Sequence, residues 1–129
     1  MDMTFHHTGI VVPSRDAATR YHAQLGLPVM TDEYVADFDC DCIFLGTRTP
    51  CVELIVPHSG HLAAFNAGRG GIHHVAYRVA DLRRFMSEFN RGQSRWLRSE
   101  PFRGARGMLV NFLSPRDLVC LTEFVEERP

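Results

Sequence analysis

Two residue types with metal-binding chemistry recur at matching places in the two halves of the sequence. His7 precedes Glu53 by 46 positions, and His74 precedes Glu123 by 49 positions. Two imidazoles and two carboxylates form a set of two nitrogen and two oxygen donors. Such a set suits borderline or hard divalent ions and leaves coordination positions open for water or a chelating substrate. The sequence therefore favours one divalent metal ion as cofactor, and Co²⁺, Mn²⁺, Ni²⁺, Zn²⁺ and Mg²⁺ all fit this set.

Taken singly, each of these residues also has an ordinary structural explanation. A lone strand histidine is more often solvated or hydrogen-bonded in a core than bound to a metal. Strand alternation places Glu53 and Glu123 among apolar neighbours, where a carboxylate needs a partner, and an arginine would serve as well as a metal. His6 and His73 precede the proposed ligands and alternate to the other face, so they are the rival ligands. The recurrence of the same types in both halves gives the four residues their weight.

The elements that would position these residues follow the same order in both halves, namely strand, helix and three strands. In the first half the pattern predicts a strand at 5–12, a helix from the Ser14 cap to Gly26, and strands at 28–36, 39–46 and 51–57. In the second half it predicts a strand at 71–79, a helix from the Asp81 cap to Gly92, and strands at 94–98, 107–113 and 118–125.

This internal repeat predicts the fold class. We expect an α+β protein in which two βαβββ modules in tandem form a curved mixed sheet around a metal-binding cavity. One domain over residues 1–129 is expected, with module one at 1–60, a Gly-rich and polar linker at 58–70, and module two at 71–129. In such a module the first and last strands can be neighbours, so that one His and one Glu face the same concavity.

Composition narrows the class of protein. A length of 129 residues with 45% hydrophobic residues is typical of one soluble globular domain, and a net charge of −1 argues against a nucleic-acid partner. The N-terminus lacks the features of a signal peptide, and no apolar run is long enough to span a membrane. We therefore expect a cytoplasmic protein without membrane contact. Its four cysteines lack zinc-site spacing and are expected to be reduced and to fill the core.

Four segments make the chain resemble the vicinal oxygen chelate superfamily, which includes glyoxalases, bleomycin-binding proteins and dioxygenases. They are HTGIVVPSRDAATRYHAQLGL at 7–27, FLGTRTPCVELIVP at 44–57, LAAFNAGRGGIHHVAYRVADL at 62–82, and SEPFRGARGMLVNFLSP at 99–115. Within the superfamily, the sequence is most similar to the methylmalonyl-CoA epimerases. The resemblance implies that His7, Glu53, His74 and Glu123 are the metal ligands.

The resemblance also implies an activity. It predicts a metal-dependent isomerase or epimerase that stabilises the enolate of a chelating acyl-thioester substrate. Glu123 is the expected proton-transfer residue and Asp41 a second one, because an epimerase needs a base on each face of the enolate. The implied partners are a small-molecule thioester of coenzyme A or glutathione and a second copy of the chain in a homodimer.

Two other functions stay open at this point. Ser114, Pro115 and Arg116 stand where epimerases carry a His-Pro-Lys segment, so recognition of a coenzyme A thioester is not assured. One alternative is a glyoxalase I-like lactoylglutathione lyase, which would use the same ligands. The other is a non-catalytic protein that binds or sequesters small molecules, and the presence of all four ligand residues argues against it.

Overall fold

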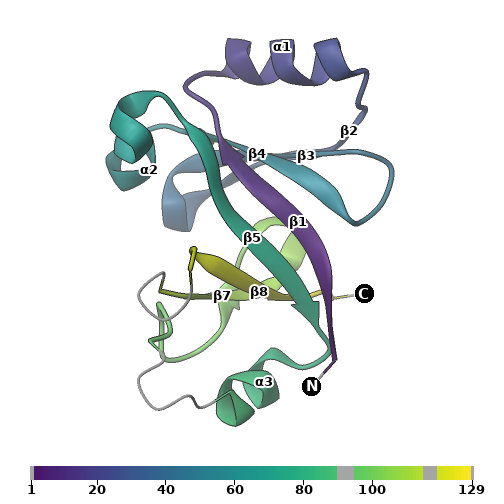
Figure 1. Cartoon of the computed structure of the whole chain (residues 1–129), viewed down its shortest axis with the longest axis vertical. Coiled ribbons are helices and arrows are strands. Elements are labelled where there is room, and N and C mark those ends of the chain that lie inside the picture. Colours follow the sequence, from purple (N-terminus) through teal and green to yellow (C-terminus); the bar gives the residue numbers. More distant parts are fainter. Residues whose placement is uncertain (1, 90–94, 115–118, 129) are drawn as a thin grey trace. The chain divides into compact units, whose positions relative to one another are not determined.

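The computed structural model describes residues 2–89, 95–114 and 119–128. Its strands and helices are β1 (Met3–Val11), α1 (Arg15–Leu25), β2 (Val29–Val35), β3 (Cys40–Leu45), β4 (Cys51–Pro57), α2 (Gly60–Ala64), β5 (Gly71–Val79), α3 (Leu82–Glu88), β6 (Phe102–Arg103), β7 (Leu109–Leu113) and β8 (Thr122–Glu126) (Figure 1). Short 3₁₀ turns lie at Ala36–Phe38, Phe65–Gly68 and Ala105–Gly107. Among the described residues, no helix is long and apolar enough to cross a membrane.

The chain forms two compact units. Unit 1 consists of Met1–His6 and His74–Pro129, and unit 2 consists of His7–His73. Each unit contains most of one predicted βαβββ module, so the two-module prediction is confirmed. The predicted module boundary at residue 71 differs from this division, because β1 and β5 each run from one unit into the other.

In unit 2 the sheet order is β2–β3–β4–β1. β1 pairs with β4 in parallel, whereas β2–β3 and β3–β4 are antiparallel, so the sheet is mixed as predicted. The connection between the parallel strands contains α1, whose ends are those expected. The Ser14 hydroxyl accepts a hydrogen bond from the Ala17 amide at 3.1 Å, and Gly26 adopts the left-handed conformation that ends many helices.

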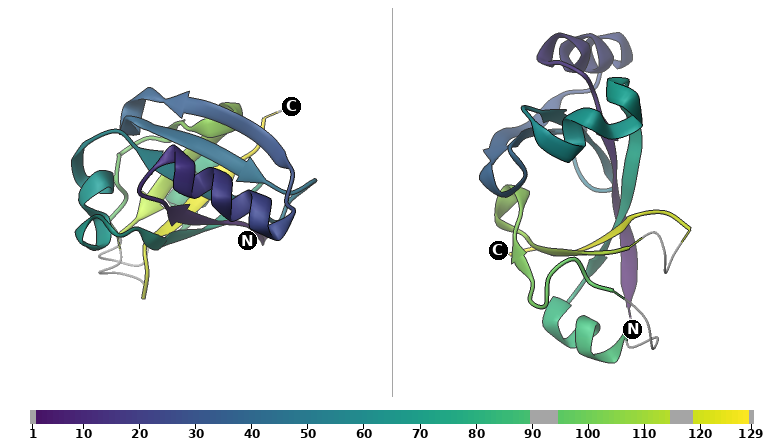
Figure 2. Two further views of the ribbon diagram at one scale, coloured as in Figure 1. Left: turned by 90° about the horizontal axis from the view of Figure 1, so that it is seen from above. Right: turned by 90° about the vertical axis from the view of Figure 1, so that its left-hand side faces the viewer.

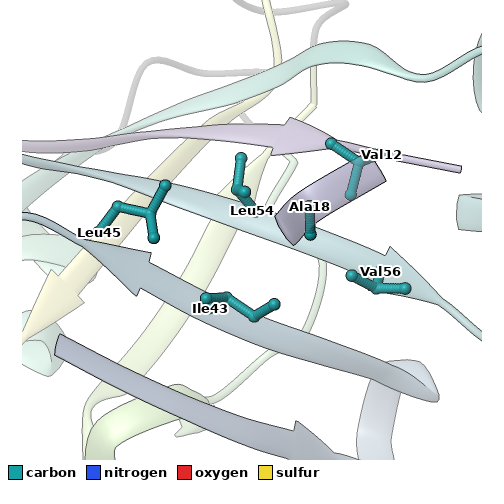
Figure 3. Packing of buried hydrophobic residues seen from close by; sticks show 6 residues of the cluster. All are labelled: Val12, Ala18, Ile43, Leu45, Leu54 and Val56. Carbon is teal, nitrogen blue, oxygen red and sulfur yellow. The ribbon is translucent and has the colours of Figure 1, made fainter. Parts of the chain in front are cut away.

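The core of unit 2 lies between α1 and one face of this sheet (Figure 3). The labelled side chains come from the helix, from two sheet strands and from the end of β1, and they are Val12, Ala18, Ile43, Leu45, Leu54 and Val56. Alternation along β3 and β4 leaves the other face of the sheet for a second set of residues. We call that second face, which carries His7, Phe44 and Glu53, the site face of unit 2.

In unit 1 the sheet order is β5–β8–β7–β6, with β5 and β8 parallel and the other pairs antiparallel. Helix α3 begins at Asp81, whose carboxylate accepts from the Arg84 amide, and it packs on one face of the strands (Figures 1 and 2). The buried cluster there is Val79, Leu82, Phe85, Leu109, Leu113 and Phe124. The opposite face, which carries His74, Phe112 and Glu123, is the site face of unit 1.

One predicted strand is wrong. The strand expected at 94–98 is reduced to a single bridge between Trp96 and Leu113 in the described residues, and the short β6 follows it instead. The reason is the buried Asn111, whose side-chain amide bonds both the amide and the carbonyl of Arg98. Two backbone hydrogen bonds also join the segment to this region, from the Leu97 amide to the Phe112 carbonyl and from the Ser114 amide to the Arg95 carbonyl, but at Arg98 the side chain replaces the regular ladder. The predicted helix end at Gly92 lies outside the described residues.

The linker enters β5 through a tight approach to β1. Gly70 has φ +77°, and a Cβ atom there would collide with the carbonyl oxygen of Val11. Only glycine satisfies both conditions, since a side chain is disfavoured at this φ and has no space. The predicted linker at 58–70 contains the short helix α2 and a 3₁₀ turn.

Candidate metal centre

The first His–Glu pair lies on the site face of unit 2. His7 Nε2 is 3.2 Å from Glu53 Oε1, and both side chains are buried. In the parallel β1–β4 ladder Gly9 is the partner of Glu53, so Glu53 stands two positions beyond the partner of His7. The edge of the Phe44 ring packs against the imidazole, with ring centroids 5.3 Å apart. The pair is therefore held on two neighbouring strands by an aromatic contact.

The second pair repeats this arrangement in unit 1. His74 Nε2 is 3.2 Å from Glu123 Oε1, and both side chains are buried. In the parallel β5–β8 ladder Ala76 is the partner of Glu123, which gives the same two-residue offset from the histidine. The Phe112 ring packs edge-on against His74 at 5.6 Å.

The strand registers show that the two modules place equivalent residues at equivalent positions of their sheets. Phe44 is the ladder partner of Glu53, and Phe112 is the ladder partner of Glu123. The small residues Gly9 and Ala76 stand opposite the two carboxylates on the other side. Each module thus builds its His–Glu pair from the same strand positions.

The donor set fits a divalent cation. A buried carboxylate is costly unless it is paired, and two carboxylates together would neutralise the charge of a divalent ion. Imidazole nitrogens and carboxylate oxygens without thiolates are ligands that several divalent metals accept. Each of the two buried pairs, His7 with Glu53 and His74 with Glu123, could therefore contribute ligands to a metal ion.

Asp41 does not join these residues. It alternates to the face of β3 that also carries Ile43 and Leu45, which is the face covered by α1. Its carboxylate lies 3.3 Å from Arg15 Nη1 and 3.1 Å from His58 Nε2.

Glu33 is a carboxylate that the sequence reasoning missed. In the antiparallel β2–β3 ladder it is the partner of Cys42, which shares the site face of unit 2 with Phe44. Its side chain is half-buried. The signal was present in the alternation of TDEYV across from CDCIFL, but it requires the hairpin register, which the sequence pattern alone leaves open.

Cys42 is a buried thiol in contact with the first pair. A hydrogen bond with Cys40, burial, and the negative charge and hydrogen bond of Glu53 all raise the pKa of Cys42, so the thiol stays protonated. The core-filling role expected of the cysteines holds for Cys40, Cys42 and Cys51, which are buried, and fails for Cys120, which is exposed.

The two rival histidines have other neighbours. His6 is buried in unit 1 with its Nε2 3.4 Å from Glu127 Oε2. His73 packs edge-on against Phe65 in unit 2, with ring centroids 5.0 Å apart. The segment that departs from the epimerase pattern at Pro115 and Arg116 lies outside the described residues.

The comparison with known families agrees with this fold. Residues 6–112 match the model of the Glyoxalase/Bleomycin resistance protein/Dioxygenase superfamily. The chain therefore belongs to this superfamily, which confirms the resemblance to the vicinal oxygen chelate proteins.

Relatives within the superfamily include named epimerases. An ethylmalonyl-CoA/methylmalonyl-CoA epimerase of Cereibacter sphaeroides is 34% identical over 125 residues, which cover 92% of this chain and 93% of the relative. A hypothetical protein of Bacillus halodurans has a solved structure with a TM-score of 0.88 and 30% identity, over 100% of this chain and 97% of that one. A variant of the Streptomyces coelicolor methylmalonyl-CoA epimerase, solved in complex with 2-nitronate-propionyl-CoA, has a TM-score of 0.86 and 27% identity over 97% of both chains.

Proposed function

We propose that this protein is a metal-dependent epimerase that inverts the carbon next to the thioester carbonyl of a small acyl-coenzyme A. His7, Glu53, His74 and Glu123 would together hold one divalent ion. The observation that carries the proposal is the buried His–Glu pair built from the same strand positions in each module. The 34% identity to an epimerase of acyl-CoA substrates supports the substrate class.

The bound metal would act as a Lewis acid and polarise two neighbouring substrate oxygens. This polarisation would lower the barrier to loss of the proton from the carbon next to the thioester carbonyl. The protein contributes the rest. His7 and His74 are braced by aromatic edges and Glu53 by its neighbours on the site face, so the ligands are oriented before substrate binds. Glu123 is the carboxylate that we expect to accept or return a proton on one face of the substrate.

An epimerase needs a second proton-transfer residue on the opposite face. The sequence reasoning gave this role to Asp41, whose carboxylate is engaged by Arg15 and His58 on the helix-covered face of β3. We assign the role to Glu33, because its half-buried side chain shares a face with Cys42 and the first His–Glu pair. A general acid–base residue of this kind contributes roughly 10²–10⁴-fold to the rate.

The test uses proton exchange, which needs no coupling enzyme. The protein is stripped with a chelator, reloaded with Co²⁺, Mn²⁺, Ni²⁺, Zn²⁺ or Mg²⁺, and incubated with methylmalonyl-CoA in D₂O. We expect deuterium to replace the α-proton only in metal-loaded protein, as followed by proton NMR. Full exchange in the stripped protein would contradict the metal role.

The same samples also distinguish the proposed epimerase from the two alternative functions, a lyase and a non-catalytic binding protein. Turnover of the hemithioacetal of methylglyoxal and glutathione, without exchange in methylmalonyl-CoA, would favour the lyase. Binding of neither metal nor thioester would leave a binding protein for other small molecules.

A further inference from the structure

The segment at 95–106 carries a surplus of positive charge. Its sequence, RWLRSEPFRGAR, contains four arginines and a single acid, Glu100. The Glu100 carboxylate lies 3.5 Å from the Nε of Arg83 on helix α3, so it is shared with a further arginine. The segment therefore offers positive charge that its own acid does not balance.

This segment forms the outer edge of the sheet in unit 1. β6 is the last strand of the order β5–β8–β7–β6, and the residues before it join β7 through the hydrogen bond from the Leu97 amide to the Phe112 carbonyl. Neither β6 nor β7 contains an acidic residue. Arg95, Arg98 and Arg103 are exposed, and we call these three residues the arginine edge.

A row of aromatic rings connects the arginine edge with the second His–Glu pair. Phe112 packs edge-on against His74, with ring centroids 5.6 Å apart, and Phe102 stacks on Phe112 at 6.5 Å. The guanidinium carbon of Arg98 lies 4.0 Å from the centroid of the Phe102 ring. Phe102 is the ladder partner of Val110, which shares the site face with Phe112 by alternation. Arg98 is thus placed at the end of a row that begins at a proposed metal ligand.

We propose that the arginine edge binds the phosphate groups at the nucleotide end of a coenzyme A thioester, with Arg98 as the direct contact. This inference rests on the proposed function and deepens it. The metal would hold the thioester end of the substrate, so the other end of the same molecule has to leave the site along one of its walls. The aromatic row of unit 1 is a wall that leads to exposed arginines.

The chemistry of this end of coenzyme A matches the arginine edge. It carries a diphosphate and a 3′-phosphate, whereas glutathione carries no phosphate. Arginine binds a phosphate through two parallel N–H donors. The contact with Phe102 restrains the Arg98 guanidinium before a ligand arrives, so less side-chain freedom is lost on binding. The chain contains no lysine, so arginines have to neutralise these phosphates.

Arg103 has a weaker part in this proposal. It follows Phe102 in β6 and alternates to the other face of the strand, so it would act through its charge and not through a direct hydrogen bond. Salt screens the interaction between exposed charges over about 10 Å at 0.1 M ionic strength. Arg98 and Arg103 should therefore differ in both the size and the salt dependence of their effects.

The binding test uses the metal-free protein and adenosine 3′-phosphate 5′-diphosphate, which is the nucleotide end of coenzyme A alone, in isothermal titration calorimetry. We expect Arg98→Ala to weaken binding by about tenfold or more, because a hydrogen bond between charged groups is lost. Arg103→Ala should weaken it less, and about 0.5 M NaCl should abolish this smaller difference. Arg20→Ala, which removes an exposed arginine of α1, is the matched control and should bind like the wild type.

Several results of this titration would overturn the inference. They are no binding of the nucleotide by the wild type, equal binding of unphosphorylated adenosine, equal affinity in the wild type and Arg98→Ala, and equal loss in Arg98→Ala and Arg20→Ala. Urea unfolding of each variant reports its folding, and the exposed position of Arg98 keeps its replacement out of the core.

The consequence for turnover is measured with methylmalonyl-CoA and with methylmalonyl-pantetheine, which lacks the nucleotide and its phosphates. The proton-exchange assay gives kcat/KM for each thioester. We expect the preference for the coenzyme A thioester, expressed as the ratio of the two values, to fall about tenfold in Arg98→Ala and to stay at the wild-type value in Arg20→Ala. An unchanged ratio in Arg98→Ala would overturn the inference.

The inference and the proposed function can fail separately. Nucleotide binding that is lost in Arg98→Ala, without proton exchange in the metal-loaded wild type, would contradict the proposed epimerase and still support a coenzyme A site at the arginine edge. Metal-dependent exchange together with nucleotide binding that Arg98→Ala does not change would overturn this inference and leave the proposed function standing.

Discussion

Phe44 lies directly across the β3–β4 ladder from Glu53 while the edge of its ring packs against His7. One apolar side chain thus restrains both members of the first His–Glu pair. Phe112 has the same relationship to Glu123 and His74 in the second module. The proposed ligands are polar, but their orientation depends on aromatic packing.

Truncation of these rings should therefore cost stability in a fixed order. Phe44 is fully buried and Phe112 is half-buried. We expect Phe44→Ala to lower the free energy of unfolding by about 3–5 kcal/mol and Phe112→Ala by less. Urea unfolding followed by circular dichroism measures both, and the reverse order would contradict an effect set by the deeper burial of Phe44.

Replacing one ligand histidine should remove the metal. We expect the purified wild type to contain roughly one divalent ion per chain and His74→Ala to contain little, since a lost imidazole leaves an incomplete donor set. His73→Ala is the matched control, because it removes the neighbouring imidazole, which packs against Phe65. Elemental analysis measures the metal content of the three proteins. Loss of metal in His73→Ala alone would mean that His73, and not His74, is the metal ligand.

The assignment of Glu33 predicts a separation between binding and exchange. Glu33→Gln should slow deuterium exchange into methylmalonyl-CoA by roughly 10²–10⁴-fold while Co²⁺ affinity stays near that of the wild type. Asp41→Asn, on the opposite strand face, should keep most of the exchange rate. If Asp41→Asn is the slow variant, the original assignment of the second base to Asp41 is restored.

The ion pair between Arg15 and Asp32 gives a pH dependence of stability. Hydrogen bonds from Arg15 lower the pKa of Asp32 below its ordinary value of 3.8. A lowered folded-state pKa contributes stability above the unfolded-state pKa, and this contribution is lost as pH falls through the folded-state pKa. The pair is largely exposed, so its contribution is at most about 1 kcal/mol.

We therefore expect Arg15→Ala to be slightly less stable than the wild type at neutral pH and equally stable in strong acid. Urea unfolding across the acid range measures this difference, with Arg20→Ala on the same helix as the control. A difference that persists after Asp32 is protonated would show that Arg15 acts through packing and not through charge.

Gly70 is the glycine whose replacement should be most damaging among the linker glycines. Gly70→Ala places a Cβ atom against the Val11 carbonyl at a φ of +77°, whereas at Gly68, with φ +80°, the nearest atom is 3.8 Å away. We expect Gly68→Ala to cost about 1–2 kcal/mol from backbone strain alone and Gly70→Ala clearly more. Thermal unfolding compares the two, and similar losses would mean that β1 and the linker separate easily.

The sequence predicted the repeat well because its signals are local. Caps at Ser14 and Asp81, the αL glycine at Gly26 and the strand at 71–79 depend on a few adjacent residues, and the structure confirms them. The strand expected at 94–98 is reduced to a single bridge because the side chain of Asn111 replaces the backbone partners at Arg98, which no local pattern reveals.

In the candidate site, too, the features with a local sequence signal were predicted and the features that depend on strand pairing were not. The four proposed ligands were visible because each recurs at the same place in its half of the chain. Glu33 and Asp41 were not distinguished, since their faces depend on the register between β2 and β3, which is a long-range property. The sequence predicted only core packing for Cys42. Its interaction with Glu53 joins two different strands and therefore depends on their register.

The passage of β1 and β5 from one unit into the other has a consequence for any attempt to divide the protein. The first six residues belong to the unit formed by the second half of the chain, and residues up to His73 belong to the unit formed by the first half. A cut in the linker therefore yields two fragments, each of which lacks some residues of the unit that it mainly forms. Neither fragment contains a whole unit, and reconstitution by mixing them would amount to fragment complementation, with recovered metal binding as its reporter.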